Sequence, residues 1–121
     1  MSNKEIVLKF YEEVFNAWDL SKLDSYMRDD YIQHSRGLPD GKAGFIGFAT
    51  EFFKKGPRMD ICKIAEDGDM VFVYFKCSFR DQGAAKVCDI YRLQDGMLAE
   101  HWDVCQGGCD TAENVSGHGE F

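Results

Sequence analysis

The sequence predicts an α+β fold, in which a curved antiparallel sheet wraps its concave face around three N-terminal helices. Two observations carry this prediction. Apolar residues recur at the helical period of 3.6 in the first half of the chain, and from residue 58 onward the period changes to about two. Helices followed by a meander of long strands are typical of an α+β layout, because the helices cover one face of the sheet.

Three helical segments are expected before the sheet. The first begins with a capping box formed by Ser2 and Glu5, and an apolar stripe follows. A brief extended segment at 31–34 and a loop at 35–41 separate the second helix from the third. The helices are predicted at residues 3–17, 19–27 and 42–54.

Four strands are expected in the second half, because β-branched and aromatic residues alternate there between Gly-containing dipeptides typical of hairpin turns. The strands are predicted at residues 58–66, 69–80, 84–93 and 97–106, and the turns at 67–68, 82–83 and 95–96. Residues 1–106 are therefore expected to form one domain. The polar, Gly-rich tail at 107–121 is expected to be loosely packed unless Phe121 docks on the domain.

The composition excludes several functional classes. A net charge of −7 repels a phosphate backbone or an anionic membrane surface, so neither nucleic acid nor membrane is expected as a partner. No apolar run approaches the ~20 residues that span a bilayer, and the N-terminus lacks the apolar core of a signal peptide. A cytoplasmic protein is expected. The 5 cysteines are an odd number without a Cys-x-x-Cys pair, which favours reduced thiols.

The polar residues that could carry chemistry lie on the last two predicted strands. His101 and Asp103 share one face at any register, because residues i and i+2 project to the same side. A two-residue loop at 95–96 places Asp89 and Tyr91 on the opposite face, whereas a three-residue loop with a G1 bulge places them alongside. We favour the three-residue loop, which pairs Asp89 with His101.

The opposite face of the same strands is predicted to be an interface. The favoured register places Arg92 beside Glu100 there, where opposite charges can interact. Ile90 and Trp102 point to this outer face as well. Aromatic residues are enriched at interfaces, so a homodimer through the outer face is expected, and an interaction domain that uses this face is an alternative.

Two carboxylates and an imidazole on one concave surface form a candidate catalytic site. Burial and a second nearby carboxylate are how proteins make a general base suited to neutral pH. Asp89, Asp103 and His101 are therefore candidate catalytic residues, and His34 could approach the same cavity from the short extended segment. Tyr91 is a weaker donor candidate. The candidate substrate-binding residues are aromatic: Trp18, Tyr31, Phe45, Phe48 and Tyr91.

No metal site is expected. His101, Cys105 and Cys109 have a spacing that aligns ligands on a helix, but the first two lie on a predicted strand. A structural zinc site also normally needs four ligands. His118 lies in the Gly-rich tail and is expected in solvent.

Four segments carry a resemblance to a known family: Tyr-Ile-Gln-His at 31–34, Asp-Gly-Lys-Ala-Gly-Phe at 40–45, Asp-Ile-Tyr-Arg at 89–92 and Glu-His-Trp-Asp-Val-Cys-Gln at 100–106. Together they resemble the SnoaL-like polyketide cyclase family, within the nuclear transport factor 2-like superfamily, over residues 4–106. The resemblance implies a cone-shaped barrel with a deep apolar pocket and commonly a homodimer through the outer sheet face. It also implies an intramolecular aldol condensation without metal or organic cofactor.

The resemblance further implies two site positions. In the family an Asp on the last strand is the acid and base, and Asp103 matches it. A His on the preceding strand assists, and this position is Asp89 here, so His101 or His34 is left to supply the donor. On this basis we expect Asp103 to remove a proton next to a carbonyl group, Asp89 to tune it, and His34 and His101 to hydrogen-bond the developing oxyanion. The sequence therefore predicts an enzyme acting on a small hydrophobic carbonyl compound; the alternative is a non-catalytic binding module that uses the same pocket.

Overall fold

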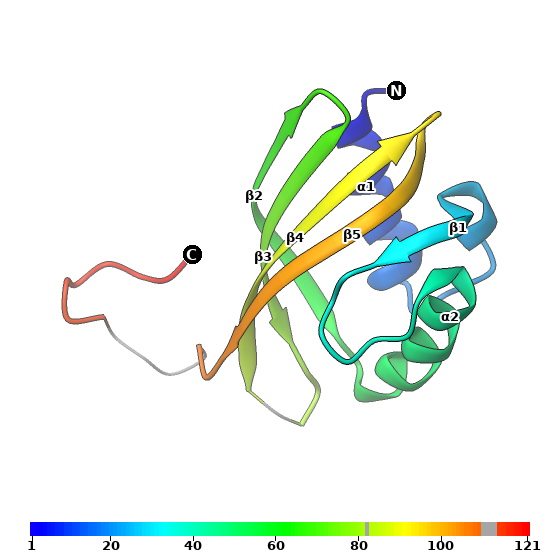
Figure 1. The fold of residues 1–121 in the computed structure, drawn as a ribbon. Helices are drawn as coiled ribbons and strands as arrows, with labels where there is room; N and C mark the ends of the chain where they lie inside the picture. The colour runs from blue at the N-terminus through cyan, green and yellow to red at the C-terminus, as the bar shows by residue number, and fades with distance from the viewer. Residues whose placement is uncertain (82, 110–113) are drawn as a thin grey trace.

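The computed structural model describes residues 1–81, 83–109 and 114–121, and shows helices on the concave side of one curved sheet (Figure 1). The helical elements are α1 (Asn3–Phe10), the π-helical turn η1 (Tyr11–Phe15), the 3-10 turn η2 (Leu23–Ser25), α2 (Gly41–Phe52) and the 3-10 turn η3 (Phe53–Lys55). The strands are β1 (Met27–Gln33), β2 (Arg58–Asp67), β3 (Met70–Ser78), β4 (Ala84–Gln94) and β5 (Met97–Gly107).

The predicted α+β class is confirmed, and β2 to β5 match the predicted strands to within two residues. The sheet order is β1-β5-β4-β3-β2, so the four consecutive strands form the expected antiparallel meander. The sheet as a whole is mixed, because β1 pairs parallel with β5. The predicted extended segment at 31–34 is thus the end of a longer strand. The predicted turn at 82–83 includes Gln82, which lies outside the described residues.

The helix predicted over 19–27 is wrong. Only the 3-10 turn η2 forms there, and β1 begins at Met27. Asp19 accepts a hydrogen bond from the backbone N–H of Ser21 (2.8 Å), an arrangement in which a side chain competes with helical hydrogen bonds. Leu23 still buries its side chain, so the apolar spacing reflects packing without a helix.

The first helix changes character after Phe10. The backbone N–H of Asn16 bonds to the carbonyl of Tyr11 (2.8 Å), which makes the second half a π-helical turn. Because the wider turn alters the helical spacing, Tyr11, Val14 and Phe15 all face the core. This turn positions Tyr11 against the sheet.

The register of β4 and β5 combines both turn alternatives. The loop at 95–96 has two residues with positive φ (Asp95 54°, Gly96 74°), which is typical of a type I′ hairpin. A bulge at Ala99 then shifts the pairing by one residue, so Asp89 lies opposite Asp103. The predicted pairing of Asp89 with His101 is wrong by two residues, whereas the predicted shared face is correct.

The end of the tail docks on the outer face of the sheet. The Tyr74 hydroxyl donates to the carbonyl of Glu120 (2.6 Å), and Lys86 Nζ lies 2.7 Å from Glu120 Oε1. The Phe121 ring lies against Tyr74, with centroids 5.9 Å apart. His118 is exposed, as predicted.

None of the helices in the described part of the chain is long and apolar enough to cross a membrane.

Candidate functional site

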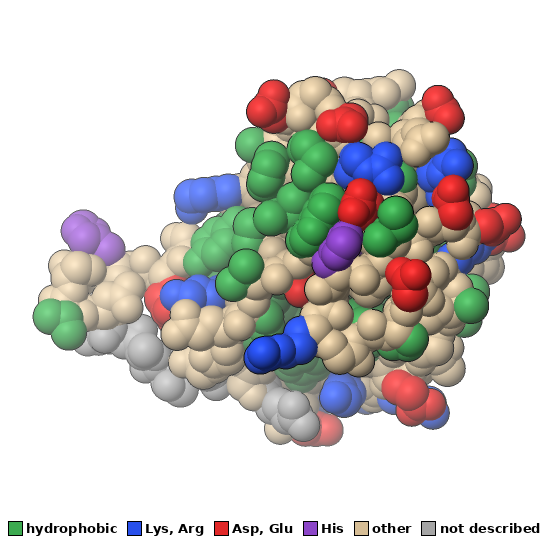
Figure 2. All heavy atoms as spheres, in the orientation of Figure 1, with side chains coloured by type: hydrophobic (Ala, Val, Ile, Leu, Met, Phe, Trp, Pro, Cys, Tyr) green, Lys and Arg blue, Asp and Glu red, His purple; other side chains and the backbone are tan. Residues whose placement is uncertain are grey.

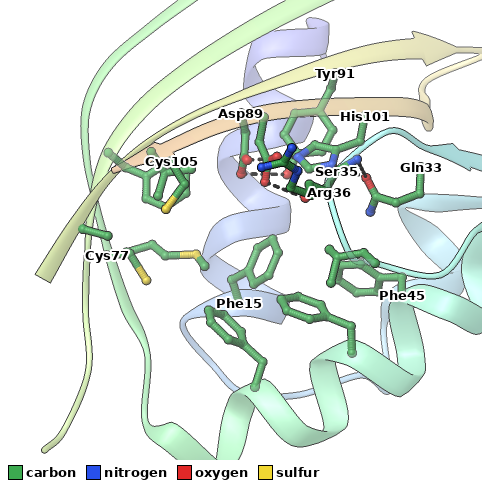
Figure 3. A pocket seen from close by; sticks show the side chains of 18 of the residues that line it. Phe15, Gln33, Ser35, Arg36, Phe45, Cys77, Asp89, Tyr91, His101 and Cys105 are labelled. Atoms are coloured by element: carbon green, nitrogen blue, oxygen red, sulfur yellow. Dashed lines mark hydrogen bonds and ion pairs between the residues drawn. The ribbon is translucent and has the colours of Figure 1, made fainter. Parts of the chain in front are cut away.

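A cavity of about 250 Å³ lies between the concave face of the sheet and the helices (Figure 3). Most of its wall is apolar and aromatic. The aromatic residues of the wall are Phe15, Tyr31, Phe45, Phe48, Phe52, Phe75, Phe79 and Tyr91. The polar groups at the wall are Gln33, Ser35, Arg36, Asp89, His101 and Asp103. An apolar cavity with a few convergent polar groups is typical of a small-molecule site.

Asp89 is a buried carboxylate whose two oxygens both accept hydrogen bonds. Oδ2 accepts from the hydroxyls of Tyr11 and Tyr91, the latter at 3.2 Å, and Oδ1 lies 2.9 Å from His101 Nε2. Its side chain is only 7 % exposed. Buried charges need such partners, so this carboxylate is held in one orientation.

His101 is fixed through both ring nitrogens. Nε2 faces Asp89, and Nδ1 lies 2.7 Å from Gln33 Oε1. The backbone N–H of Ser35 also bonds to Gln33 Oε1 (3.0 Å). Because a backbone N–H can only donate, this contact identifies the amide atom beside His101 as oxygen, and His101 Nδ1 therefore carries a proton. Neither ring nitrogen is free to reach a ligand while these bonds hold.

Asp103 is held more loosely than Asp89. It is half-buried, and its Oδ2 accepts a hydrogen bond from the Ser35 hydroxyl (2.9 Å). Oδ1 has no donor among the described residues. The loop that carries Ser35 packs closely on α2, where a Cβ at Gly44 would lie 2.3 Å from the Pro39 carbonyl oxygen. The site therefore contains one carboxylate with an open oxygen beside one that is fully bonded.

Two buried tyrosines, Tyr11 and Tyr91, bond to the same oxygen of Asp89. The hydroxyls of Tyr11 and Tyr91 lie 2.9 Å apart, and both rings are buried. Burial, followed by the charge of Asp89, raises the pKa of Tyr11 and of Tyr91 well above the ordinary value. Both phenols therefore stay protonated and donate to Asp89.

Sulfur atoms line another part of the cavity wall, from Met59, Cys77 and Cys105 (Figure 3). Burial raises the pKa of the Cys77 thiol to about 12 and also raises that of Cys105. Thiols that stay protonated are poor nucleophiles. This region is therefore suited to packing rather than covalent chemistry.

The structure brings together seven of the nine predicted site residues. The cavity wall includes Tyr31, Phe45, Phe48, Asp89, Tyr91, His101 and Asp103. Their roles remain predictions, but their predicted proximity is observed.

His34 is a correction, because it lies on the outer face. Side chains alternate along β1, and since Gln33 points inward, His34 points outward. Its ring stacks on Trp102 with centroids 4.8 Å apart, and its Nε2 lies 2.6 Å from Glu100 Oε2. His34 therefore cannot donate to a ligand in the cavity.

Trp18 is the second correction. It follows the first helix in a left-handed conformation (φ 53°) and is 45 % exposed. Its Nε1 donates to the carbonyl of Pro57 (2.7 Å), and Arg80 lies 5.5 Å from its ring. This tryptophan fixes a loop and does not line the cavity.

The sequence-based metal alternative is not formed. Cys109 is not part of the cavity wall, and its thiol donates to the Gln106 carbonyl (3.3 Å). Asp89, His101 and Asp103 do offer ligand atoms within 4.8 Å of one another. However, the ring nitrogens of His101 and the oxygens of Asp89 are already hydrogen-bonded, so an ion would have to break these bonds.

Four polar residues of the site were missed from the sequence: Tyr11, Gln33, Ser35 and Arg36. Tyr11 belongs to the apolar stripe of the first helix and reads as core. Gln33 and Ser35 flank His34, and the strand parity that turns them inward depends on the pairing of β1 with β5. The period of two places Tyr31 and Gln33 on one face of the strand, but it does not say which face is turned inward.

The comparisons with known proteins agree with this architecture. A family model for the SnoaL-like domain matches residues 7–101. The fold is similar to that of IdmH, "a putative polyketide cyclase from Streptomyces antibioticus" (TM-score 0.75, 19 % identity, covering 87 % of this chain and 92 % of that chain). A "putative polyketide cyclase" from Acidithiobacillus ferrooxidans gives a TM-score of 0.74 at 22 % identity, covering 87 % and 91 %.

A third neighbour carries a different activity in its description. AclR, "a putative hydroxylase from Streptomyces galilaeus", gives a TM-score of 0.72 at 20 % identity, covering 85 % of this chain and 77 % of that chain. A search of curated proteins finds no match. Structural likeness at such identities shows the fold alone. The matched family model spans most of the chain, and the protein therefore belongs to the SnoaL-like domain family.

Proposed function

We propose that this protein transfers a proton at a carbon next to the carbonyl group of a small hydrophobic metabolite, without a metal or organic cofactor. The observation that carries the proposal is the open Oδ1 of Asp103 at the polar end of an apolar cavity. A general base must reach the proton that it removes, and Asp103 meets this requirement where Asp89 does not. The aromatic wall favours a hydrophobic substrate.

The neighbouring groups have a supporting role in this proposal. Asp89 holds His101 in one orientation, and both ring nitrogens of His101 face acceptors. This arrangement suits an imidazolium, whose positive charge offsets one of the two carboxylates. Asp103 can then act as base without a second uncompensated charge beside it.

A non-catalytic binding module is the second candidate. It is favoured by the internal hydrogen bonding of Asp89, His101 and Tyr91, which leaves few polar atoms for a ligand. The same cavity would then hold an apolar ligand with Asp103 and Ser35 as its anchors.

A screen of carbonyl compounds against the wild type and Asp103→Asn separates the two candidates. Aromatic ketones, lactones and steroid-like ketones are tested by thermal shift, because a ligand at a hundred times its Kd stabilises the fold by roughly 2.7 kcal/mol. Each hit is then followed for chemical change. Conversion by the wild type, with binding alone by Asp103→Asn, supports the enzyme; binding by both without conversion supports the module.

We further propose that two copies of the chain pair through the outer face of the sheet. Phe72 is 39 % exposed and Val104 70 % exposed on this face, where Phe72, Ile90 and Trp102 lie in one row across β3, β4 and β5. Figure 2 shows hydrophobic side chains gathered over the middle of the sheet. Large exposed apolar patches mark interaction sites, and interfaces are enriched in aromatic residues.

A further inference from the structure

The site needs hydrogen-bond donors that the predicted residues do not supply. When a proton leaves a carbon next to a carbonyl group, negative charge develops on the carbonyl oxygen. His34 is outside the cavity, and both nitrogens of His101 are bonded. The Tyr91 hydroxyl is bonded to Tyr11 and Asp89. All three predicted donors are therefore occupied.

Gln33 presents the donor end of its amide on the inner face of β1. Its Oε1 is held by the Ser35 N–H and by His101 Nδ1. The other amide atom must then be the nitrogen, which carries two N–H groups and lies on the side away from His101 (Figure 3). Two contacts to the oxygen thus orient the nitrogen before any ligand binds.

Tyr31 lies two residues earlier on the same face, and its ring is fixed. The ring stacks on His101 with centroids 6.5 Å apart and contacts Phe45 edge-on at 6.3 Å. Its hydroxyl hydrogen has no acceptor among the described residues. In the described part of the chain, every fully buried polar side-chain atom has a hydrogen-bond partner. Because the Tyr31 hydroxyl oxygen has none, it is not fully buried, and it opens onto the cavity that Tyr31 lines.

Charge and burial keep Tyr31 in its donor form. Burial, followed by the charge of Asp89, raises the pKa of the Tyr31 hydroxyl. Tyr31 and Gln33 both line the cavity and lie two residues apart on the same face of β1, so their donors point to the same region. Ser35 links the base to these donors, because its hydroxyl bonds to Asp103 (2.9 Å) and its backbone N–H bonds to the Gln33 amide oxygen (3.0 Å).

We propose that the Tyr31 hydroxyl and the Gln33 amide nitrogen together bind the carbonyl oxygen of the substrate and stabilise it as an enolate. This inference rests on the proposed function of the cavity. Tyr31 and Gln33 are then catalytic residues, and Ser35 and His101 are positioning residues that orient the amide.

The chemical step balances within the site. The carboxylate of Asp103 takes the proton as the C–H bond breaks, and the electron pair moves to the carbonyl oxygen, which Tyr31 and Gln33 hydrogen-bond. Asp103 then returns the proton to the same carbon or to a conjugated one, which regenerates the carboxylate. No oxidant, reductant or second substrate is needed.

The test measures binding of an enolate mimic rather than turnover. The probe is 4-nitrophenol at a pH where it is ionised to the phenolate. Nitrobenzene is the matched compound that lacks the phenolate oxygen. Both are titrated against Asp103→Asn, in which the base is neutral as after proton removal. The donor variants Tyr31→Phe and Gln33→Glu are added to this background. Gln33→Glu keeps an acceptor for Ser35 and His101 but removes the N–H donors and adds a negative charge, so the neutral variant Gln33→Met is measured beside it.

The expected result is a loss of nitrophenolate affinity of about 10- to 100-fold in each donor variant, because hydrogen bonds to a charged oxygen are strong. Nitrobenzene affinity stays unchanged. The control Tyr26→Phe loses a hydroxyl that bonds to Glu13 (2.8 Å) away from the cavity, and should bind both probes normally.

Equal nitrophenolate affinity in folded Tyr31→Phe and Gln33→Glu overturns the inference. The proposed function survives that result if the wild type still converts a carbonyl compound that Asp103→Asn only binds. Failure of both probes to bind to Asp103→Asn overturns the donor pair as well, whereas only the conversion assay decides the proposed function.

Discussion

The two faces of β4 and β5 each carry a carboxylate paired with a histidine, and the pairs differ mainly in their surroundings. On the inner face Asp89 and His101 are 2.9 Å apart and each about 7 % exposed. On the outer face Glu100 and His34 are 2.6 Å apart, at 18 % and 41 % exposed. The inner pair is enclosed by tyrosines and an amide, whereas the outer pair lies at the surface of the single chain, on the face proposed to pair with a second copy.

This difference determines what each pair can do. Water screens the outer pair, so its charge affects little beyond its own neighbours, although bonds from His34 and Arg92 hold the pKa of Glu100 below its ordinary value. In the cavity the same kind of pair has fixed orientation and fixed proton positions. The comparison teaches that alternation along a strand decides on which face a carboxylate and a histidine meet. Burial and neighbouring side chains then decide whether the pair can take part in catalysis.

The largest expected difference in stability is between Asp89→Ala and Glu100→Ala. Asp89→Ala leaves the hydroxyls of Tyr11 and Tyr91 and the His101 ring without their acceptor, which should lower the free energy of unfolding by about 3–5 kcal/mol. Glu100→Ala removes partly exposed ion pairs to His34 and Arg92 and should lower it by about 1–2 kcal/mol. Urea unfolding of the two variants measures both values. Equal losses would show that the two faces do not differ as described.

A smaller effect is expected for Tyr11→Phe, which removes one donor to Asp89 and should lower the free energy of unfolding by about 1–3 kcal/mol at neutral pH. The folded pKa of Tyr11 is raised, so its proton-linked stability is fully present below the unfolded pKa of ~10 and is lost as pH rises through the folded pKa.

The stability of the wild type and of Tyr11→Phe should therefore depend differently on pH in the alkaline range. The wild type should lose stability above about pH 10, and Tyr11→Phe should lose less over the same range because one linked proton is gone. Thermal unfolding across this range, with tyrosine ionisation followed by ultraviolet absorbance, tests it. If the two proteins lose stability with rising pH at the same rate, Tyr11 is not part of the buried hydrogen-bond network around Asp89.

The smallest expected effect on the folded monomer is that of Trp102→Glu on the outer face. This substitution removes a half-buried ring that stacks on His34 and should lower the free energy of unfolding by about 1 kcal/mol. It should nevertheless convert a dimer into a monomer, because it places a charge in the proposed apolar interface. Sedimentation measures the mass, and an unchanged mass for the variant would contradict the proposed dimer.

Much of the fold could be predicted because its signals are local. Alternation and Asp-Gly turns predict β2 to β5 to within two residues, and the shared face of Asp89, His101 and Asp103 follows from the period of two. The shared face was predicted correctly, but from a three-residue loop that does not form. The two-residue loop and the bulge at Ala99 give the same face, and nothing in the local sequence indicates this bulge.

What could not be predicted depends on contacts between distant segments. The parallel pairing of β1 with β5 turns Gln33 inward and His34 outward, and nothing within residues 31–34 decides that parity. The π-helical turn brings Tyr11 to Asp89 from 78 positions away in the chain. Both site corrections and the missed donors have this nonlocal origin.

The central claim, that the inner carboxylate Asp103 moves a proton next to a carbonyl group, is tested most directly by proton exchange in heavy water. The carbonyl compound identified by the screen is incubated with wild type, Asp103→Asn and Glu100→Gln, and loss of the α-proton signal is followed by NMR. The account predicts exchange at least about 100-fold slower in Asp103→Asn and a wild-type rate in the outer-face variant. Exchange at the wild-type rate in Asp103→Asn would contradict the claim.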